Sequence, residues 1–140
     1  MADPKRDRAS YLTVQQQYEL ECAAFIVNNV FHHLSYGLYQ VGSTLSRPDW
    51  RDVDLRYITQ DSQFDALFGY VDSPMHTFLN TVISEWFERR TGLPVDFQFQ
   101  RQTEANAKYS IKDGHKRNAV GIIMEIAFNE HRSRSEGGVR

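Results

Sequence analysis

Residues 36–58 read YGLYQVGSTLSRPDWRDVDLRYI and contain the pattern of two neighbouring strands, from which the expected fold is built. Its opening, YGLYQV, is rich in aromatic and β-branched types, which favours a short strand that Gly42 and Ser43 end. Residues 52–58 alternate between polar and apolar side chains, which predicts a second, half-buried strand. The segment between the two strands, residues 44–51, is expected to be a loop or a single helical turn.

Helices are expected on both sides of this pair of strands. Thr13 and Gln16 form a capping-box pattern that begins a helix running to about Leu34. Its apolar stripe consists of Leu20, Ala23, Val27, Val30, Phe31 and Leu34. A second helix begins at Ser73-Pro74 and ends at Gly92. Its apolar stripe consists of Met75, Phe78, Leu79, Val82, Ile83 and Trp86.

The rest of the chain completes an α+β fold. Residues 93–100, LPVDFQFQ, alternate again and predict a third strand. A helical turn or two is expected near residues 64–68, and Asn118 is expected to cap a final helix. The apolar side chains of that final helix are Val120, Ile122, Ile123, Ile126 and Ala127. We expect a small mixed sheet with the helices packed on one face and acidic side chains on the other.

Length and composition indicate a single globular domain. The chain has 140 residues with 41% hydrophobic content, so we expect one domain over residues 10–131. Residues 1–9 are expected to be disordered and residues 132–140 to form a flexible basic tail. No apolar run is long enough to cross a membrane. Cys22 is the only cysteine, which excludes an internal disulfide and favours a reducing, cytoplasmic setting.

Charge is unevenly distributed along the sequence. Residues 1–100 contain 8 Lys/Arg and 13 Asp/Glu, whereas residues 101–140 contain 8 Lys/Arg and 5 Asp/Glu. The basic stretch KDGHKRN, residues 112–118, contains Lys116 and Arg117 and is a candidate contact for a triphosphate or a nucleic-acid backbone. The alternative interpretation is an ordinary solvated loop.

Three carboxylates lie within predicted strands, where Asp is disfavoured. Asp52 and Asp54 are two positions apart, so both would point to one face, and Asp96 lies in the third strand. If the strands pair, the three acids form one anionic cluster, which a divalent cation such as Mg²⁺ would neutralise. The alternative is that Asp52 and Asp54 face solvent on an edge strand while Asp96 lies in a turn.

The Gly42-Ser43 step precedes the acids and has the chemistry of a phosphate contact. Glycine lets the backbone approach a ligand closely, and Ser43 offers a hydroxyl together with a backbone N–H. A strand ending in Gly-Ser, followed by a strand with paired acids and a strand with a third acid, is suited to binding a nucleoside triphosphate with metal ions. The aromatic side chains of Trp50 and Tyr57 lie near the acids and would either stack on a base or pack in the core.

This order of motifs resembles the DNA polymerase β-like nucleotidyltransferase superfamily. The matching elements, within residues 36–100, are Val41-Gly42-Ser43, Asp52-Val53-Asp54-Leu55 and Val95-Asp96-Phe97. The predicted helix that ends at Gly92 fills the place between the second and third acids, as in the family. The spacer after Ser43 is short for the family, and Arg47 is followed by Pro48 where many small members have an Arg-Gly step.

The resemblance implies metal-dependent transfer of a nucleoside monophosphate from an NTP to an acceptor hydroxyl, with release of pyrophosphate. Asp52 and Asp54 would bridge two Mg²⁺ or Mn²⁺ ions, and Asp96 would bind the catalytic ion and help to deprotonate the acceptor. Gly42 and Ser43 would hold the β- and γ-phosphates. The nucleotide-binding set is completed by Arg47, Lys116 and Arg117.

The sequence leaves the acceptor open. An RNA end, a protein side chain and a small molecule such as an aminoglycoside are all compatible with the motifs, and small family members also act as toxin–antitoxin components. A different class of function is a catalytically silent module that binds nucleotide or nucleic acid through its basic C-terminal part. The intact set of Asp52, Asp54 and Asp96 argues against that alternative, because a silent domain has no need to keep a repulsive cluster.

Overall fold

The computed structural model describes residues 10–108 and 117–122. Its elements are, in order, α1 (Val14–Val30), β1 (Gly37–Val41), the 3-10 turn η1 (Gly42–Leu45), β2 (Val53–Thr59), α2 (Asp61–Phe68), α3 (Pro74–Thr91), β3 (Val95–Arg101), α4 (Gln102–Lys108) and β4 (Asn118–Ala119). The expectations for residues 1–9, Lys116 and the tail at 132–140 lie outside the described residues.

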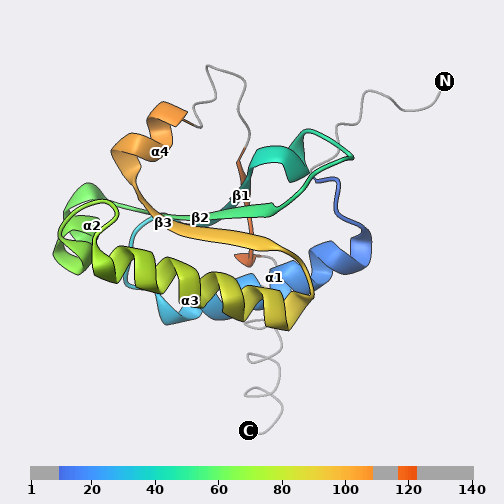
Figure 1. Cartoon of the computed structure of the whole chain (residues 1–140), viewed down its shortest axis with the longest axis horizontal. Coiled ribbons are helices and arrows are strands. Elements are labelled where there is room, and N and C mark those ends of the chain that lie inside the picture. Colours follow the sequence, from blue (N-terminus) through green and yellow to red (C-terminus); the bar gives the residue numbers. More distant parts are fainter. Residues whose placement is uncertain (1–9, 109–116, 123–140) are drawn as a thin grey trace, which may run out of the picture.

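The strands form one mixed sheet in the order β3-β2-β1-β4 (Figure 1). β1 pairs with both β2 and β4 in antiparallel fashion, whereas β2 and β3 are parallel. A parallel pair requires a crossover connection, which α2 and α3 provide. This arrangement confirms the α+β class and the small mixed sheet.

The sequence predicted all the helices on one face of the sheet, and this prediction is wrong. In Figure 1, α1 and α3 run along one face, whereas α4 and η1 lie on the opposite side. The reason for the position of α4 is local: β3 ends at Arg101 and the helix begins at the next residue, Gln102. Ala105 then packs α4 against the sheet and is completely buried.

The predicted helix starts are confirmed. The Thr13 side chain accepts the N–H of Gln16 while the Gln16 side chain accepts the N–H of Thr13, which is a complete capping box. Ser73 caps α3 ahead of Pro74, and Gly92 ends α3 in the left-handed region at φ +74°. The first helix is shorter than predicted, because it ends at Val30 rather than near Leu34.

The core lies between the sheet and the layer formed by α1 and α3. Its largest fully buried side chains include Tyr57, Phe64, Phe87, Phe97 and Phe99. The Tyr57 hydroxyl donates to the carbonyl oxygen of Phe31 at 2.9 Å, and Trp50 packs against the edge of this core. Of the two aromatic side chains near the acids, Tyr57 therefore belongs to the hydrophobic core, and Trp50 is partly buried against it.

A row of polar side chains on α3, one per helical turn, bonds the unpaired edge of β3. They are His76 (donating from Nε2 to the Phe99 carbonyl, 2.8 Å), Asn80 (accepting from the Phe99 N–H, 2.9 Å), Ser84 (accepting from the Phe97 N–H, 2.8 Å) and Glu88 (accepting from the Val95 N–H, 3.2 Å). These contacts cover the strand edge, which would otherwise be open to pairing with another chain.

The polar row changes which face of α3 is buried. Ile83 and Phe87 enter the core, but Met75, Phe78 and Val82 from the predicted apolar stripe are exposed. The prediction for that part of the stripe is therefore wrong. The hydrogen bonds to β3 turn the polar row toward the sheet, so the apolar residues on the opposite side of the helix point away from it.

Residues 118 and 119, near the end of the described chain, form a strand rather than the start of a helix. Asn118 does not cap a helix but pairs with Gln40 as part of β4, so that prediction is wrong. Ile123, Ile126 and Ala127 of the expected final helix lie outside the described residues. Within the described ranges, no helix combines the length and the apolar character needed to span a membrane.

Candidate active site

The site is built around two aspartates on adjacent parallel strands. Asp54 of β2 and Asp96 of β3 are direct register partners. Their sequence neighbours, such as Leu55 and Phe97, point into the core, so the two carboxylates lie on the opposite face of the sheet. Both aspartates are half-buried. We call Asp54 and Asp96 the acid pair.

The end of β1 closes tightly against the acid pair. Val41 is the register partner of Asp54, and the next residue is Gly42, with φ +78°. A Cβ atom at Gly42 would overlap the Oδ2 atom of Asp54, so only glycine fits here. Ser43 follows in η1, where its carbonyl oxygen accepts the N–H groups of Ser46 and Arg47 at 3.1 and 2.9 Å.

A buried arginine binds one member of the acid pair, Asp96. Arg56 is only 6% exposed, and its Nη1 atom donates to the carbonyl oxygens of Leu55 and Asp96, each at 2.8 Å. Its Nη2 atom donates to Oδ2 of Asp96 at 3.3 Å. Arg56 follows Asp54 by two positions in β2, so both side chains lie on the same face of the sheet. Because residues 52–58 alternate between polar and apolar types, this was expected to be the polar face, and the sequence did not predict the burial of Arg56.

The electrostatic environment of Asp54 is dominated by desolvation. Burial raises the pKa of Asp54 above its ordinary value of 3.8, and the nearby Arg56 guanidinium lowers that pKa. The neighbouring carboxylates Asp96 and Asp52 raise it, while Lys108 lowers it. The charged form of Asp54 is therefore less favourable in the folded protein than in water, as expected of a half-buried carboxylate.

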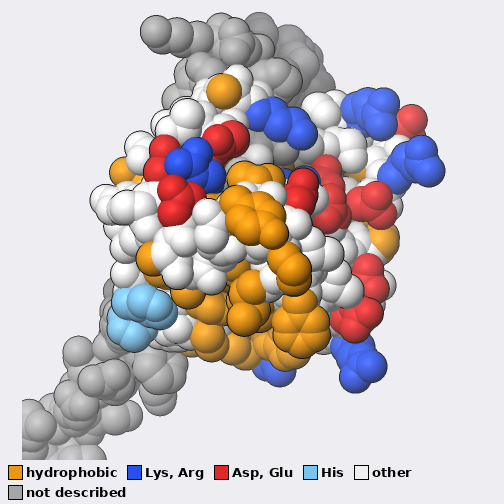
Figure 2. All heavy atoms as spheres, turned by 60° about the vertical axis from the view of Figure 1, so that its left-hand side comes forward, with side chains coloured by type: hydrophobic (Ala, Val, Ile, Leu, Met, Phe, Trp, Pro, Cys, Tyr) orange, Lys and Arg blue, Asp and Glu red, His pale blue; other side chains and the backbone are white. Residues whose placement is uncertain are grey.

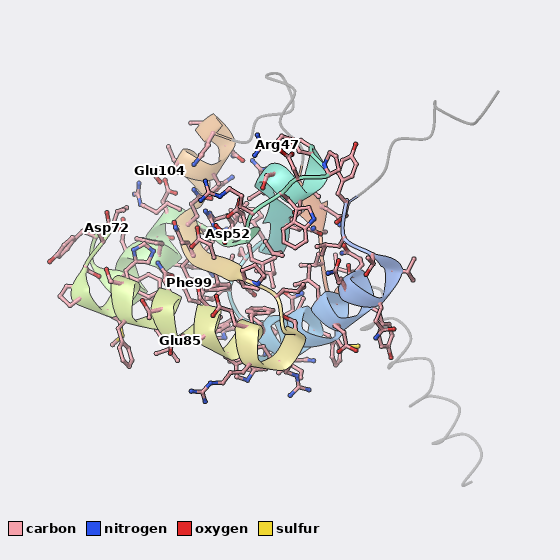
Figure 3. The ribbon with its side chains drawn as sticks, turned by 45° about the vertical axis from the view of Figure 1, so that its right-hand side comes forward. Arg47, Asp52, Asp72, Glu85, Phe99 and Glu104 are labelled. Atoms are coloured by element: carbon pink, nitrogen blue, oxygen red, sulfur yellow. The ribbon has the colours of Figure 1, made fainter. Side chains whose placement is uncertain are left out.

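Asp52 is separate from the acid pair. It is exposed and lies immediately before β2 begins at Val53, so strand pairing does not fix its side chain. Asp52 and Asp96 both line an open groove of about 490 Å³ beside α3. Three further acids, Asp72, Glu85 and Glu88, also line it. Figure 3 labels Asp52, and it shows Asp72 at the end of the molecule where α2 meets α3.

The acid pair has the oxygen ligands of a divalent-cation site but not a full cluster of them. In the part of the chain that the structure describes, no three or more His, Cys, Asp or Glu side chains converge closely enough to hold a metal ion. The expected triad is thus a pair of neighbours with a third acid nearby. Carboxylate oxygens are nevertheless the ligands that Mg²⁺ prefers, so the donor chemistry of the acid pair fits such an ion.

Of the basic residues named from sequence, Arg47 and Arg117 lie within the described residues. Arg47 is exposed, and its Nε atom lies 3.6 Å from Oδ1 of Asp49. Arg117 lies over the ring of Tyr39, 5.9 Å from the ring centre, and donates to Oδ1 of Asn106 at 2.6 Å. Tyr39 is the register partner of Arg56, so Arg117 lies over the sheet face that carries the acid pair.

Comparisons with known proteins give no relative. No family model matches this chain, and neither a curated protein nor a solved structure is detectably similar to it. An assignment of function therefore depends on the acid pair and the residues around it.

Proposed function

We propose that this protein is a metal-dependent nucleotidyltransferase that moves an NMP from an NTP to an acceptor hydroxyl. The observation that supports this most is the register of β2 and β3, which brings Asp54 and Asp96 side by side next to Gly42. Two adjacent carboxylates offer oxygen ligands for a cation, and the Gly42-Ser43 backbone, which would contact the phosphates, follows directly beside Asp54. The motifs named from sequence thus meet at one end of one sheet face.

Each residue has a distinct role in this proposal. Asp54 and Asp96 hold divalent cations, with Asp52 as a further ligand, and Gly42-Ser43 contacts the phosphates. When bound, Mg²⁺ or Mn²⁺ would neutralise charge on the triphosphate and on the attacking oxygen. The acceptor oxygen forms a bond to the α-phosphorus while the bond to the β-phosphate oxygen breaks. The acceptor proton passes to Asp96, and pyrophosphate leaves.

The buried guanidinium supports the same chemistry. Arg56 holds both the backbone carbonyl and one carboxylate oxygen of Asp96, which fixes the direction of that side chain. Gln98 donates to the other carboxylate oxygen at 3.3 Å. Arg56 is therefore a positioning residue in this proposal, because it acts through Asp96.

A second candidate function is a binding module without catalysis. It is favoured by the ion pair between Arg56 and Asp96, in which a protein cation already neutralises the carboxylate that a metal would need. In that case Arg117 and the basic residues that precede it in sequence would bind nucleotide or nucleic acid through phosphate contacts.

For the enzyme, the acceptor is an RNA end, a protein side chain or a small molecule.

Pyrophosphate release distinguishes the two candidates. Full-length protein is incubated with each NTP and Mg²⁺ or Mn²⁺, with total RNA and protein as acceptors, and pyrophosphate and labelled products are measured. We expect turnover that Asp54→Asn and Asp96→Asn each reduce by at least about 10²-fold, or roughly 2.7 kcal/mol of barrier.

The matched control is Glu19→Gln, which removes one carboxylate charge on α1, on the other side of the sheet. Its turnover should equal that of the wild type. If NTP binds and wild-type protein releases no pyrophosphate with any acceptor, the binding module is supported. If Asp54→Asn and Asp96→Asn also turn over like the wild type, the acid pair is not catalytic.

A further inference from the structure

An apolar band crosses the outer side of α2 and α3. Its members are large hydrophobic side chains that are each between 42% and 64% exposed, namely Leu67, Tyr70, Val71, Met75, Phe78 and Val82. Figure 2 shows hydrophobic side chains gathered over this face, with acidic and basic side chains at its margins. We call these six residues the apolar band.

The band lacks charge to an unusual degree. Residues 73–84 read SPMHTFLNTVIS and contain no Asp, Glu, Lys or Arg, although 24% of the chain is charged. An exposed helix face normally carries charged side chains. Loss of charge together with exposed aromatic residues such as Phe78 and Tyr70 is the composition of an interface centre.

The size of the band is that of an interface. Six large side chains at these exposures present on the order of 600 Å² of apolar surface, which is the upper end of the roughly 300–600 Å² found for the largest patch of a typical monomer, a patch that is often functional. A stable complex removes about 800 Å² per partner, so the band and its rim suffice for one side of such a contact.

We propose that the apolar band is the dimer interface of this protein, occupied by the same band of a second copy. If two α3 helices cross in antiparallel fashion near Phe78, the two-fold axis sets Met75 opposite the partner's Val82. The residues nearest the crossing on this face of α3, namely Met75, Phe78 and Val82, are then all apolar.

This self-pairing also leaves charges out of the contact. Charges on α3 are confined to its C-terminal half, beginning at Glu85, and antiparallel crossing through the first half directs the two charged halves away from each other. Packed helices cross at an angle, so contact is limited to the turns nearest the crossing point. A two-fold contact of this kind closes on itself and gives a dimer rather than a fibre.

Light scattering on the full chain tests the proposal. We expect a particle of twice the 16.3 kDa chain mass, which Phe78→Glu converts to monomer because a charge would be buried at the crossing. Thr77→Glu is the matched control: Thr77 is an exposed neighbour on the other flank of the helix, in the acidic groove. It should remain a dimer. Thermal melts confirm that both variants fold.

Cross-linking gives a second measurement that does not depend on a charge. In a Cys22→Ala background, Phe78→Cys should form an intermolecular disulfide on mild oxidation, and Thr77→Cys should not. A wild-type chain that is monomeric throughout the micromolar range would overturn the proposal and leave residues 123–140 or another protein as occupants of the band. A dimer that Phe78→Glu leaves intact would overturn it equally.

Discussion

Gly42 and Asp54 show how a single residue type can be required by its neighbour. Gly42 has φ +78°, and an added methyl group would overlap Oδ2 of Asp54. We expect Gly42→Ala to lower the free energy of unfolding by more than the roughly 1–2 kcal/mol cost of a left-handed residue, because Asp54 must also move. Urea denaturation measures the loss, and turnover should fall with it.

Gly69 offers a control with the same backbone and no neighbour. Its φ is +81°, and nothing lies within 4 Å of an added Cβ atom. Gly69→Ala should therefore show the left-handed cost alone and leave turnover unchanged. Equal losses of stability in the two alanine variants would show that the contact between Gly42 and Asp54 has no energetic effect.

The raised pKa of Asp54 makes a prediction about stability and pH. Burial raises this pKa above 3.8, so the folded state binds the proton more tightly than the unfolded state. The contribution of Asp54 to stability is therefore greatest below about pH 4 and declines as pH rises through the raised pKa. We expect Asp54→Asn to be more stable than the wild type at pH 7, measured by urea denaturation.

The difference between the two proteins should vanish in acid, where Asp54 is neutral in both states. Asp49→Asn is the comparison variant, because it removes one carboxylate charge from an exposed side chain outside the acid pair. An Asp54→Asn protein that is less stable than the wild type at pH 7 would mean that the Arg56 guanidinium outweighs the effect of burial.

Helix α3 hydrogen-bonds the free edge of β3, the strand that carries Asp96, and so holds that strand in place. The Ser84 hydroxyl accepts the N–H of Phe97 at 2.8 Å and lies 3.3 Å from the carbonyl oxygen of the same residue. Ser84→Ala leaves both backbone groups without this partner. We expect it to cost about 1–3 kcal/mol of unfolding free energy and to speed hydrogen exchange at the Phe97 amide.

Thr81→Ala is the matched control for that prediction. Thr81 also loses a hydroxyl, but its hydrogen bond lies within α3, to the carbonyl oxygen of Thr77. It should have little effect on stability and none on exchange at Phe97. If the two variants exchange alike at that amide, the polar row on α3 does not hold the edge of β3.

The same row explains what hydrophobic periodicity could and could not predict. Local signals are sufficient for the ends of α3, because the Ser73 cap and the left-handed Gly92 need only nearby backbone atoms. Which side of the helix is buried depends on a partner distant in sequence. Asn80 and Ser84 look like solvent-facing residues until the free edge of β3 lies beside them.

The topology of the whole sheet brings the two members of the acid pair together, because β2 and β3 are parallel neighbours in it. The alternating patterns around Asp54 and Asp96 predicted two strands and the faces of their side chains. Only the parallel pairing of β2 with β3 makes them neighbours, and no short-range pattern specifies that pairing. Asp52 lies one residue before β2 begins, so the pairing of the strands does not fix its side chain beside the other two acids.

Ligand binding at the acid pair should raise the stability of the fold. A ligand that binds only the folded state adds about 2.7 kcal/mol at 100 times its Kd, which corresponds to a rise in Tm on the order of 10 °C for a chain of this size. We expect Mg²⁺ with a slowly hydrolysed NTP analogue to raise the Tm of the wild type and of Glu19→Gln equally. Without ligand at pH 7, Asp54→Asn should have a higher Tm than the wild type. Adding the ligand should raise the Tm of this variant only a little. Repulsion and desolvation at the acid pair would thus lower the stability of the empty fold, and cation binding would restore it. A wild-type melting curve unchanged by Mg²⁺, Mn²⁺ and nucleotide together would count against both the metal and the nucleotide at this site.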